Sequence, residues 1–281
     1  MISNISLLTP KRILRESSAT ARALRSLALS LIALVAASCG SRTREATPSA
    51  TPSVTPLPVA ELLRRADEQY AARADLGQVR EGLKTIRRIR AVEFDNYEAA
   101  WRAARLDYTL GDRSDDDRER EQAFTDGMES GETATRVEPN RAEGHFWLGA
   151  NYGGYAEFKG VLYGITYTVK LRREMEAVIK IDPSFEAGSA YLGLGQLDRE
   201  LPEMLGGDPQ RAVKTLEDGL KYGENNALLR LELAQAYLAT KRKDDARREL
   251  TWVVNSKPDP NHLPEHEEAV KTARELLAKN F

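Results

Sequence analysis

A helical packing pattern recurs along the chain at a nearly constant spacing, and this recurrence limits the folds that the chain can adopt. Offsets of 0, 3, 4 and 7 place side chains on one face of an α-helix, and such a set begins at Trp101, His145, Ser189 and Arg230. The first three sets are 44 residues apart, and the fourth follows after 41. Because no stretch after Val59 alternates convincingly like a strand, the sequence predicts an all-α solenoid of antiparallel helix pairs.

The residues at the last two offsets are often small and aromatic, as in Gly149 and Tyr152. This arrangement resembles the first helix of a tetratricopeptide repeat, in which the small residue lets the second helix approach closely. We expect the second helices to end before Pro139, Pro183 and Pro258, because proline cannot continue a helix. A HEAT-like solenoid, with its period of about 40–47 residues, is the alternative.

The repeat spacing also predicts the domain boundaries. We expect a degenerate first repeat at 60–96, four clear repeats, and a closing helix at 265–279, which gives a tetratricopeptide-repeat domain at 60–281. A simple repeat has about 34 residues, so the copies displaced by 44 contain insertions. We place these insertions at 111–117, 154–167 and 196–208.

The N-terminal segment, residues 1–38, has the features of a lipoprotein signal peptide. Five basic side chains and one acidic one accompany an apolar run at 27–38, which is shorter than the roughly 20 residues of a stable membrane span. The only cysteine, Cys39, follows Ala36, Ala37 and Ser38, and this junction resembles the lipobox of bacterial lipoproteins, in which the cysteine is lipidated. An ordinary signal peptide with an incidental thiol is the alternative.

Residues 39–59 read as a tether between the lipid and the folded body. Prolines at 48, 52, 56 and 58 oppose a helix, and the Ser and Thr residues between them have little to bury. The lipoprotein resemblance implies a location on the periplasmic side of a bacterial membrane. Gly40, in place of an aspartate after the cysteine, favours the outer membrane.

Charge is distributed unevenly between the signal peptide and the rest of the chain. The whole chain has a net charge of −2, and residues 1–38 contribute +4, which leaves −6 for the remainder. Such a mildly acidic body gives no electrostatic reason to bind nucleic acid or an anionic membrane surface.

Three stretches resemble a narrower family than the repeat alone does. They lie at 144–164 (GHFWLGANYGGYAEFKGVLYG), 181–195 (IDPSFEAGSAYLGLG) and 201–208 (LPEMLGGD). Together they resemble the T component associated with tripartite ATP-independent periplasmic (TRAP) transporters, and they are also similar to eukaryotic regulators of microtubule dynamics. The resemblance, which extends over 60–281, implies a periplasmic lipoprotein that works beside the substrate-binding component of a small-molecule importer, with apolar ligands among the candidates. A general tetratricopeptide scaffold lipoprotein for cell-envelope assembly is the alternative, and self-association into a homo-oligomer stays open.

Aromatic residues are concentrated in the segment that contains the longest insertion. The candidates for binding a ligand or partner are Trp147, Tyr152, Tyr155, Phe158 and Tyr163. Repeat solenoids commonly present grooves and pockets, and the nearby glycines would let a ligand or backbone come close. Packing in the core between repeats is the alternative role for the same side chains.

Two clusters of acidic or histidine residues fit helix starts better than metal chemistry. His262, Glu265 and His266 have the spacing of a zinc-protease motif, but Pro264 opposes a helix through all three. We interpret them as the beginning of the last helix, and the acidic residues that follow Ser114 in the same way. The sequence contains no nucleophile–base pair, phosphate loop or cofactor fingerprint, so we expect neither enzymatic activity nor a metal or cofactor.

Overall fold

The computed structural model describes residues 57–258 and 263–281, with the backbone alone at 161–165 and 263–264. The predicted signal peptide, Cys39 and nearly all of the tether lie outside these residues, so the expectations for them remain predictions. Within the described ranges the chain is helical and contains no strand, which confirms the predicted all-α class. None of the helices in these ranges has the length and apolar character needed to span a membrane.

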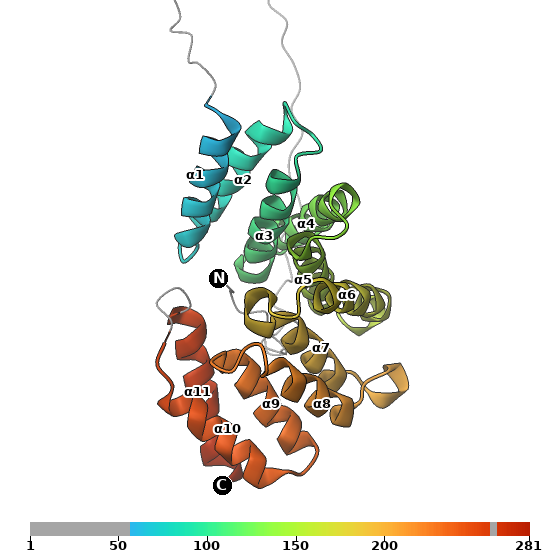
Figure 1. Cartoon of the computed structure of the whole chain (residues 1–281), viewed down its shortest axis with the longest axis vertical. Helices are drawn as coiled ribbons and strands as arrows, with labels where there is room; N and C mark the ends of the chain where they lie inside the picture. Colours follow the sequence, from blue (N-terminus) through green and yellow to red (C-terminus); the bar gives the residue numbers. More distant parts are fainter. Residues whose placement is uncertain (1–56, 259–262) are drawn as a thin grey trace, which may run out of the picture. The chain divides into compact units, whose positions relative to one another are not determined.

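The described part contains eleven α-helices and two short 3-10 helices (Figure 1). In chain order they are α1 (Val59–Ala71), α2 (Leu76–Arg90), α3 (Tyr97–Arg113), α4 (Asp117–Val137), α5 (Ala142–Lys159), α6 (Val161–Ile181), η1 (Phe185–Gly188), α7 (Ser189–Glu200), η2 (Glu203–Leu205), α8 (Pro209–Gly219), α9 (Ala227–Ala239), α10 (Lys243–Asn255) and α11 (Leu263–Asn280). Consecutive helices from α1 to α10 pack as five pairs, and α11 packs on α10 and α9. This order confirms the predicted succession of repeats and closing helix.

The helix ends follow local sequence signals. The side chains of Asn96, Asp116 and Asp208 accept hydrogen bonds from backbone N–H groups in the first turns of α3, α4 and α8, which satisfies donors that have no partner inside the helix. The acidic run after Ser114 is therefore a helix start, as predicted. The second helices α4 and α6 end two residues before Pro139 and Pro183, which confirms the predicted stops.

Two of the three predicted insertions lengthen helices, in most of their length or in part. Helix α5 continues to Lys159 and α6 begins at Val161, so most of 154–167 is helical, with Gly160 alone between the two helices. Gly160 has a φ of 80°, which a glycine adopts without a steric cost. The third insertion, at 196–208, extends α7 to Glu200 and then forms a turn around η2.

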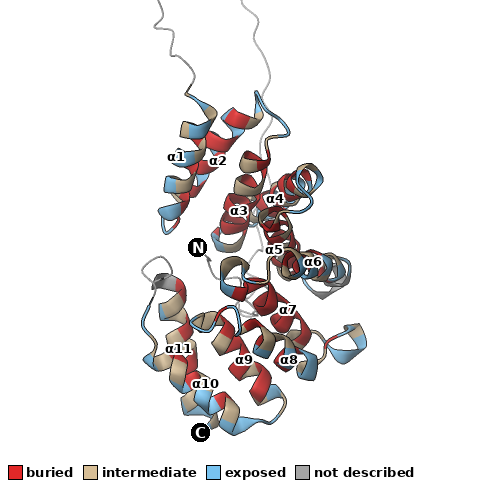
Figure 2. Ribbon diagram, in the orientation of Figure 1, coloured by how far each residue is buried: buried red, intermediate tan, exposed pale blue. Residues whose placement is uncertain are grey.

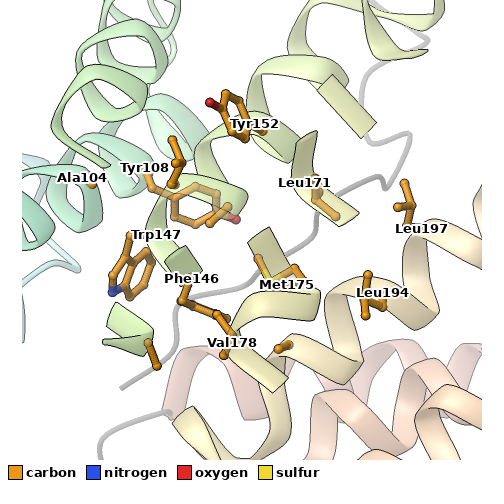
Figure 3. Packing of buried hydrophobic residues seen from close by; sticks show 14 of the residues in the cluster. Ala104, Tyr108, Phe146, Trp147, Tyr152, Leu171, Met175, Val178, Leu194 and Leu197 are labelled. Carbon is orange, nitrogen blue, oxygen red and sulfur yellow. The ribbon is translucent and has the colours of Figure 1, made fainter. Parts of the chain in front are cut away.

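The largest hydrophobic cluster lies in the middle of the repeat array (Figures 2 and 3). It combines aromatic rings with aliphatic side chains, and its fully buried members include Phe124, Phe146, Trp147, Leu171 and Met175. Burial of this much apolar surface is the main contribution to stability in such a body. The cluster joins α3 to α7, so the central repeats share one core.

Glycines bring the central helices close together. A Cβ atom on Gly131 of α4 would lie 2.9 Å from the Cα of Leu148, and one on Gly154 of α5 would lie 2.3 Å from the ring of Phe124. At Gly149, the predicted small position, a Cβ would lie 2.8 Å from Met175 on α6. At Gly131 and Gly154 these distances leave no room for a side chain, whereas at Gly149 the close atom is the end of the flexible Met175 side chain.

Candidate functional site

A surface pocket of about 490 Å³ lies between α4, α5 and α6, and we call it the α4–α6 pocket. Its lining comes from three helices: Glu132, Thr135, Arg136, His145, Leu148, Tyr152, Arg173, Glu174 and Ala177. Helix α5 provides the base of the pocket through Leu148 and Tyr152, which belong to the buried cluster. Packing of α4 and α6 on α5 therefore places charged side chains from two repeats around a fixed apolar base.

A histidine–carboxylate pair connects two sides of this pocket. The Nδ1 atom of His145 lies 2.6 Å from Oε2 of Glu174, and its Nε2 atom lies 2.9 Å from the carbonyl oxygen of Pro139. The hydrogen bond to Glu174 raises the pKa of His145, and the one to Pro139 acts in the same direction. Because both acceptors lack a proton to donate, the geometry fits an imidazolium that donates from both ring nitrogens.

Glu174 is buried and takes part in a second ion pair. Arg173 donates to its Oε1 atom at 2.9 and 2.6 Å. Although burial acts to raise the pKa of Glu174, the hydrogen bonds from His145 and Arg173 lower it below its ordinary value. These two partners keep the carboxylate ionised at the edge of an apolar core, where a buried charge without partners would be unfavourable.

A third polar contact ties α5 to α4. The hydroxyl group of Tyr152 donates to Oε1 of Glu132 at 2.9 Å. Burial, followed by this hydrogen bond, raises the pKa of Tyr152, so the phenol stays protonated at neutral pH. The ring of Tyr152 belongs to the core, while its hydroxyl belongs to the pocket.

A strip of aromatic rings extends from Tyr152 along α5 and α6, and we call it the tyrosine strip. The ring of Tyr167 lies 5.8 Å from that of Tyr152 and 5.0 Å from that of Tyr155. The ammonium group of Lys170 lies 5.0 Å from the centre of the Tyr152 ring, and that of Lys159 lies 5.6 Å from the Tyr155 ring. Cations at these distances are attracted to the ring faces, so the strip has a polar rim.

The structure places the five aromatic candidates in different surroundings. Trp147 is buried in the core, where its ring contacts those of Phe146 and Tyr108 (Figure 3). Tyr152 lies at the edge of the same cluster and lines the pocket. Tyr155 and Phe158 are partly buried against the cluster, and the side chain of Tyr163 lies outside the described residues. A binding role for these residues stays a prediction.

Sequence reasoning missed the charged residues of the pocket. His145 occupies a packing position of the repeat pattern, while Glu132, Arg173 and Glu174 lie on second helices, for which the sequence predicted only the proline stops. The sequence contains one signal for this site. His145 occupies an offset at which another copy has tryptophan, and a polar residue at such a packing position needs a hydrogen-bond partner.

Metal binding has no support among the side chains that the structure describes, since no three His, Cys, Asp or Glu residues there are gathered as ligands. His262 of the zinc-protease spacing lies outside those residues. Glu265, in the first turn of α11, instead pairs with Arg73 at 3.3 Å.

Comparison with solved structures supports the repeat assignment. The chain is similar to TTC0263, a thermophilic tetratricopeptide-repeat protein from Thermus thermophilus, with a TM-score of 0.56 and 21% identity over 75% of this chain and 98% of that one. It also matches the MamA protein with a TM-score of 0.45 and 14% identity, over 79% and 94% of the two chains. The first likeness shows a tetratricopeptide fold and so favours it over the HEAT alternative.

Comparison with sequences identifies the family. No curated protein matches the chain. The family model described as regulator of microtubule dynamics protein 1-3 matches residues 62–280, which is nearly the whole described part. This agrees with the similarity that the stretches at 144–164, 181–195 and 201–208 indicate. The chain therefore belongs to the regulator of microtubule dynamics protein 1-3 family.

Proposed function

We propose that this protein is a lipid-anchored binding protein of the bacterial envelope, whose repeat body binds a polar segment of a partner protein at the α4–α6 pocket. The observation that carries the proposal is the lining of that pocket. Acidic and basic side chains from two repeats surround a base that the core holds in place.

The size and polarity of the pocket define what fits there. A volume of about 490 Å³ lies within the roughly 300–1,000 Å³ of ligand pockets, and it accommodates a few side chains but no folded domain. Its lining includes Glu132, Glu174, Arg136 and Arg173, so it favours a segment with charged or hydrogen-bonding groups over an apolar ligand.

The tyrosine strip extends this surface beyond the pocket. Tyr155, Phe158 and Tyr167 are partly buried against the core, so their rings are already held before a partner binds. Rigid aromatic side chains provide contact area with a low loss of conformational entropy. We infer that an extended segment fills the pocket and continues over the strip.

The resemblance to the T component of TRAP transporters suggests the identity of the partner. We propose that it is the periplasmic substrate-binding component of such an importer, and a scaffold role in envelope assembly is the second candidate. The test is to crosslink the tagged full-length lipoprotein in its own bacterium, purify it and identify the attached proteins by mass spectrometry. Recovery of a substrate-binding protein supports the importer role, whereas recovery of outer-membrane assembly proteins alone contradicts it.

The anchor is a separate part of the proposal. Because Cys39 is the only cysteine and follows a run of small residues, Cys39→Ser should abolish incorporation of a fatty-acid analogue. Metabolic labelling of the variant and the parent in the same strain measures this. Equal labelling of the two chains would exclude Cys39 as the lipidation site.

A further inference from the structure

The turn between α2 and α3 exposes two large apolar side chains. Val92 is 76% exposed and Phe94 is 60% exposed, and they lie two residues apart. We call residues 87–95 the α2–α3 tip. Two exposed apolar side chains this close together form a small apolar patch, and an apolar patch with a polar rim is typical of an interaction site.

Arginines accompany the exposed apolar side chains. The last turn of α2 contains Arg87, Arg88 and Arg90. The guanidinium of Arg90 lies 5.5 Å from the ring centre of Phe94 and also donates to Ser130 at 2.9 Å. Arg87 and Arg88 are exposed, and neither has an ion pair with another described residue. Arg87 also interacts electrostatically with the buried Asp107 of α3, so of the two charges that of Arg88 is the more available to an external anion.

The acidic residues of the tip are engaged in contacts of their own. Asn96 donates to Glu93 at 2.7 Å, and Arg136 pairs with Asp95 at 2.5 Å. The tip contains Arg87, Arg88 and Arg90 against Glu93 and Asp95, a formal charge of +1, and Asp95 is the acidic residue that has a cationic partner, although the chain after residue 38 is acidic in total. The net charge of the body hid this patch, because a sum over the sequence does not show which side chains lie together.

The tip lies at the end of the first helix pair where the body joins the preceding segment. Helices α1 and α2 are antiparallel, so Val59, which begins α1, and Arg90, which ends α2, lie at the same end of the pair (Figure 1). Nineteen residues separate Cys39 from Val59. If Cys39 is anchored as proposed, this end of the body is the one held near the bilayer, and this step of the argument rests on the proposed function.

We propose that the α2–α3 tip is a second membrane contact. Phe94 and Val92 enter the interfacial region of the bilayer, while Arg87 and Arg88 bind the phosphate groups of anionic lipids. Basic side chains beside exposed apolar ones bind membrane surfaces in this way. Two points of attachment would orient the body, so that the α4–α6 pocket has a defined direction relative to the membrane.

Vesicle binding by the body alone tests the proposal. Four hydrophobic clusters are built from residues between Tyr97 and Leu277, and α1 and α2 add buried side chains from Leu62 onward, so a chain of residues 58–281 has its own core. We would float it with vesicles of phosphatidylcholine, with and without phosphatidylglycerol, and compare Phe94→Ser and the double variant Arg87→Ser, Arg88→Ser. Met204→Ser is the matched control, because Met204 is 90% exposed and its neighbours 202–206 contain no basic residue.

The expected result is binding to the anionic vesicles that depends on both parts of the tip. Phe94→Ser should weaken the affinity for anionic vesicles roughly tenfold or more. The double arginine variant should weaken the affinity roughly twentyfold. Met204→Ser should leave the affinity unchanged. Thermal melting should be the same for all variants, since the substituted side chains are exposed. Absence of binding by the parent body, or equal binding by all variants, would overturn the proposal.

The result is independent of the anchor and of the partner. The chain of residues 58–281 lacks Cys39, so a failure of lipid labelling would not change the vesicle measurement. A failure of vesicle binding would in turn leave Cys39 labelling and partner recovery to be judged on their own results.

Discussion

The central helices α3–α6 and the C-terminal helices α7–α10 follow the same repeat but are packed with different side chains. The central helices have 17–21 residues and use glycines against large side chains, with the ring of Phe124 against Gly111 and Gly154. The helices α7–α10 have 11–13 residues and pack through aliphatic side chains such as Leu216 and Leu233, and one glycine contact recurs between α7 and α8, where a Cβ on Gly195 would lie 2.4 Å from Leu216. The comparison shows that a glycine in one helix and a ring in the next can replace aliphatic packing. The close glycine contacts also bring α4 against α5, where the α4–α6 pocket lies.

The largest expected effect concerns the ring that separates the central glycines. Phe124→Ala should lower the free energy of unfolding by about 3–5 kcal/mol, because the adjacent Gly111 and Gly154 have no side-chain atoms that could fill the cavity. Chemical denaturation measures the change. A loss below about 1 kcal/mol would show that the central helices do not depend on this contact.

Replacement of a central glycine by alanine, which adds a single methyl group, should already lower the stability of the protein. Gly154→Ala should lower the free energy of unfolding by about 1–3 kcal/mol, because the new Cβ atom would lie 2.3 Å from the Phe124 ring. The cost should shrink when Phe124 is already leucine, since the ring is then absent. Gly77→Ala in α2 is the control, because there the nearest atom, at 3.0 Å, belongs to the flexible side chain of Asp75. Additive effects in the double variant would contradict the contact.

The two regions should also differ in how their stability depends on pH, and this difference should be smaller than the effects of the core substitutions. In the centre, the hydrogen bond to Glu174 raises the pKa of His145. Its stabilisation is complete below pH 6.5 and is lost as the pH rises through the raised pKa. In α7, burial raises the pKa of Glu200 to about 8, so its contribution is complete below about pH 4.5 and is lost as the pH rises towards 8.

Denaturation series over pH measure both contributions. His145→Gln should remove only the decline in stability that begins above pH 6.5, and Glu200→Gln should remove a decline that begins at lower pH. Identical pH profiles for the parent and the His145→Gln variant would show that the His145–Glu174 pair contributes nothing to stability.

Much of the fold was predictable from the sequence because its signals are local. The repeat offsets, the stops before Pro139 and Pro183, and the close approach at Gly149 each depend on residues within one repeat. The lengths of α5 and α6 were not predictable in the same way. Glycine has a low helix propensity, but Gly154 lies within α5 and packs closely against Phe124, a tertiary contact that the repeat offsets do not show.

The candidate site was less predictable because its contacts join distant residues. His145 and Glu174 are 29 residues apart, and Glu132 and Tyr152 are 20 apart. Each pair depends on how one helix is rotated relative to the next, which the offsets do not determine. Aromatic content pointed to the segment that contains Tyr152, yet it did not distinguish Trp147, which fills the core, from Tyr152, which also reaches the pocket.

The central claim is that the α4–α6 pocket, and not the C-terminal repeats, binds the partner. Two arginines allow a matched test: Arg173 at the pocket is 71% exposed and pairs with Glu174, and Arg248 on α10 is 67% exposed and pairs with Asp245. Glu174 is only 5% exposed whereas Asp245 is 21% exposed, so Arg173→Ser should cost more stability than Arg248→Ser, and binding is compared at a temperature at which both variants are fully folded.

The decisive measurement is the affinity of each variant for the protein recovered with the intact lipoprotein, determined by titration calorimetry. The account predicts that Arg173→Ser weakens binding about tenfold or more, because a hydrogen bond to a charged group is lost, and that Arg248→Ser binds like the parent. Parent-like binding by Arg173→Ser, or a loss confined to Arg248→Ser, would contradict the assignment of the binding site to the central repeats.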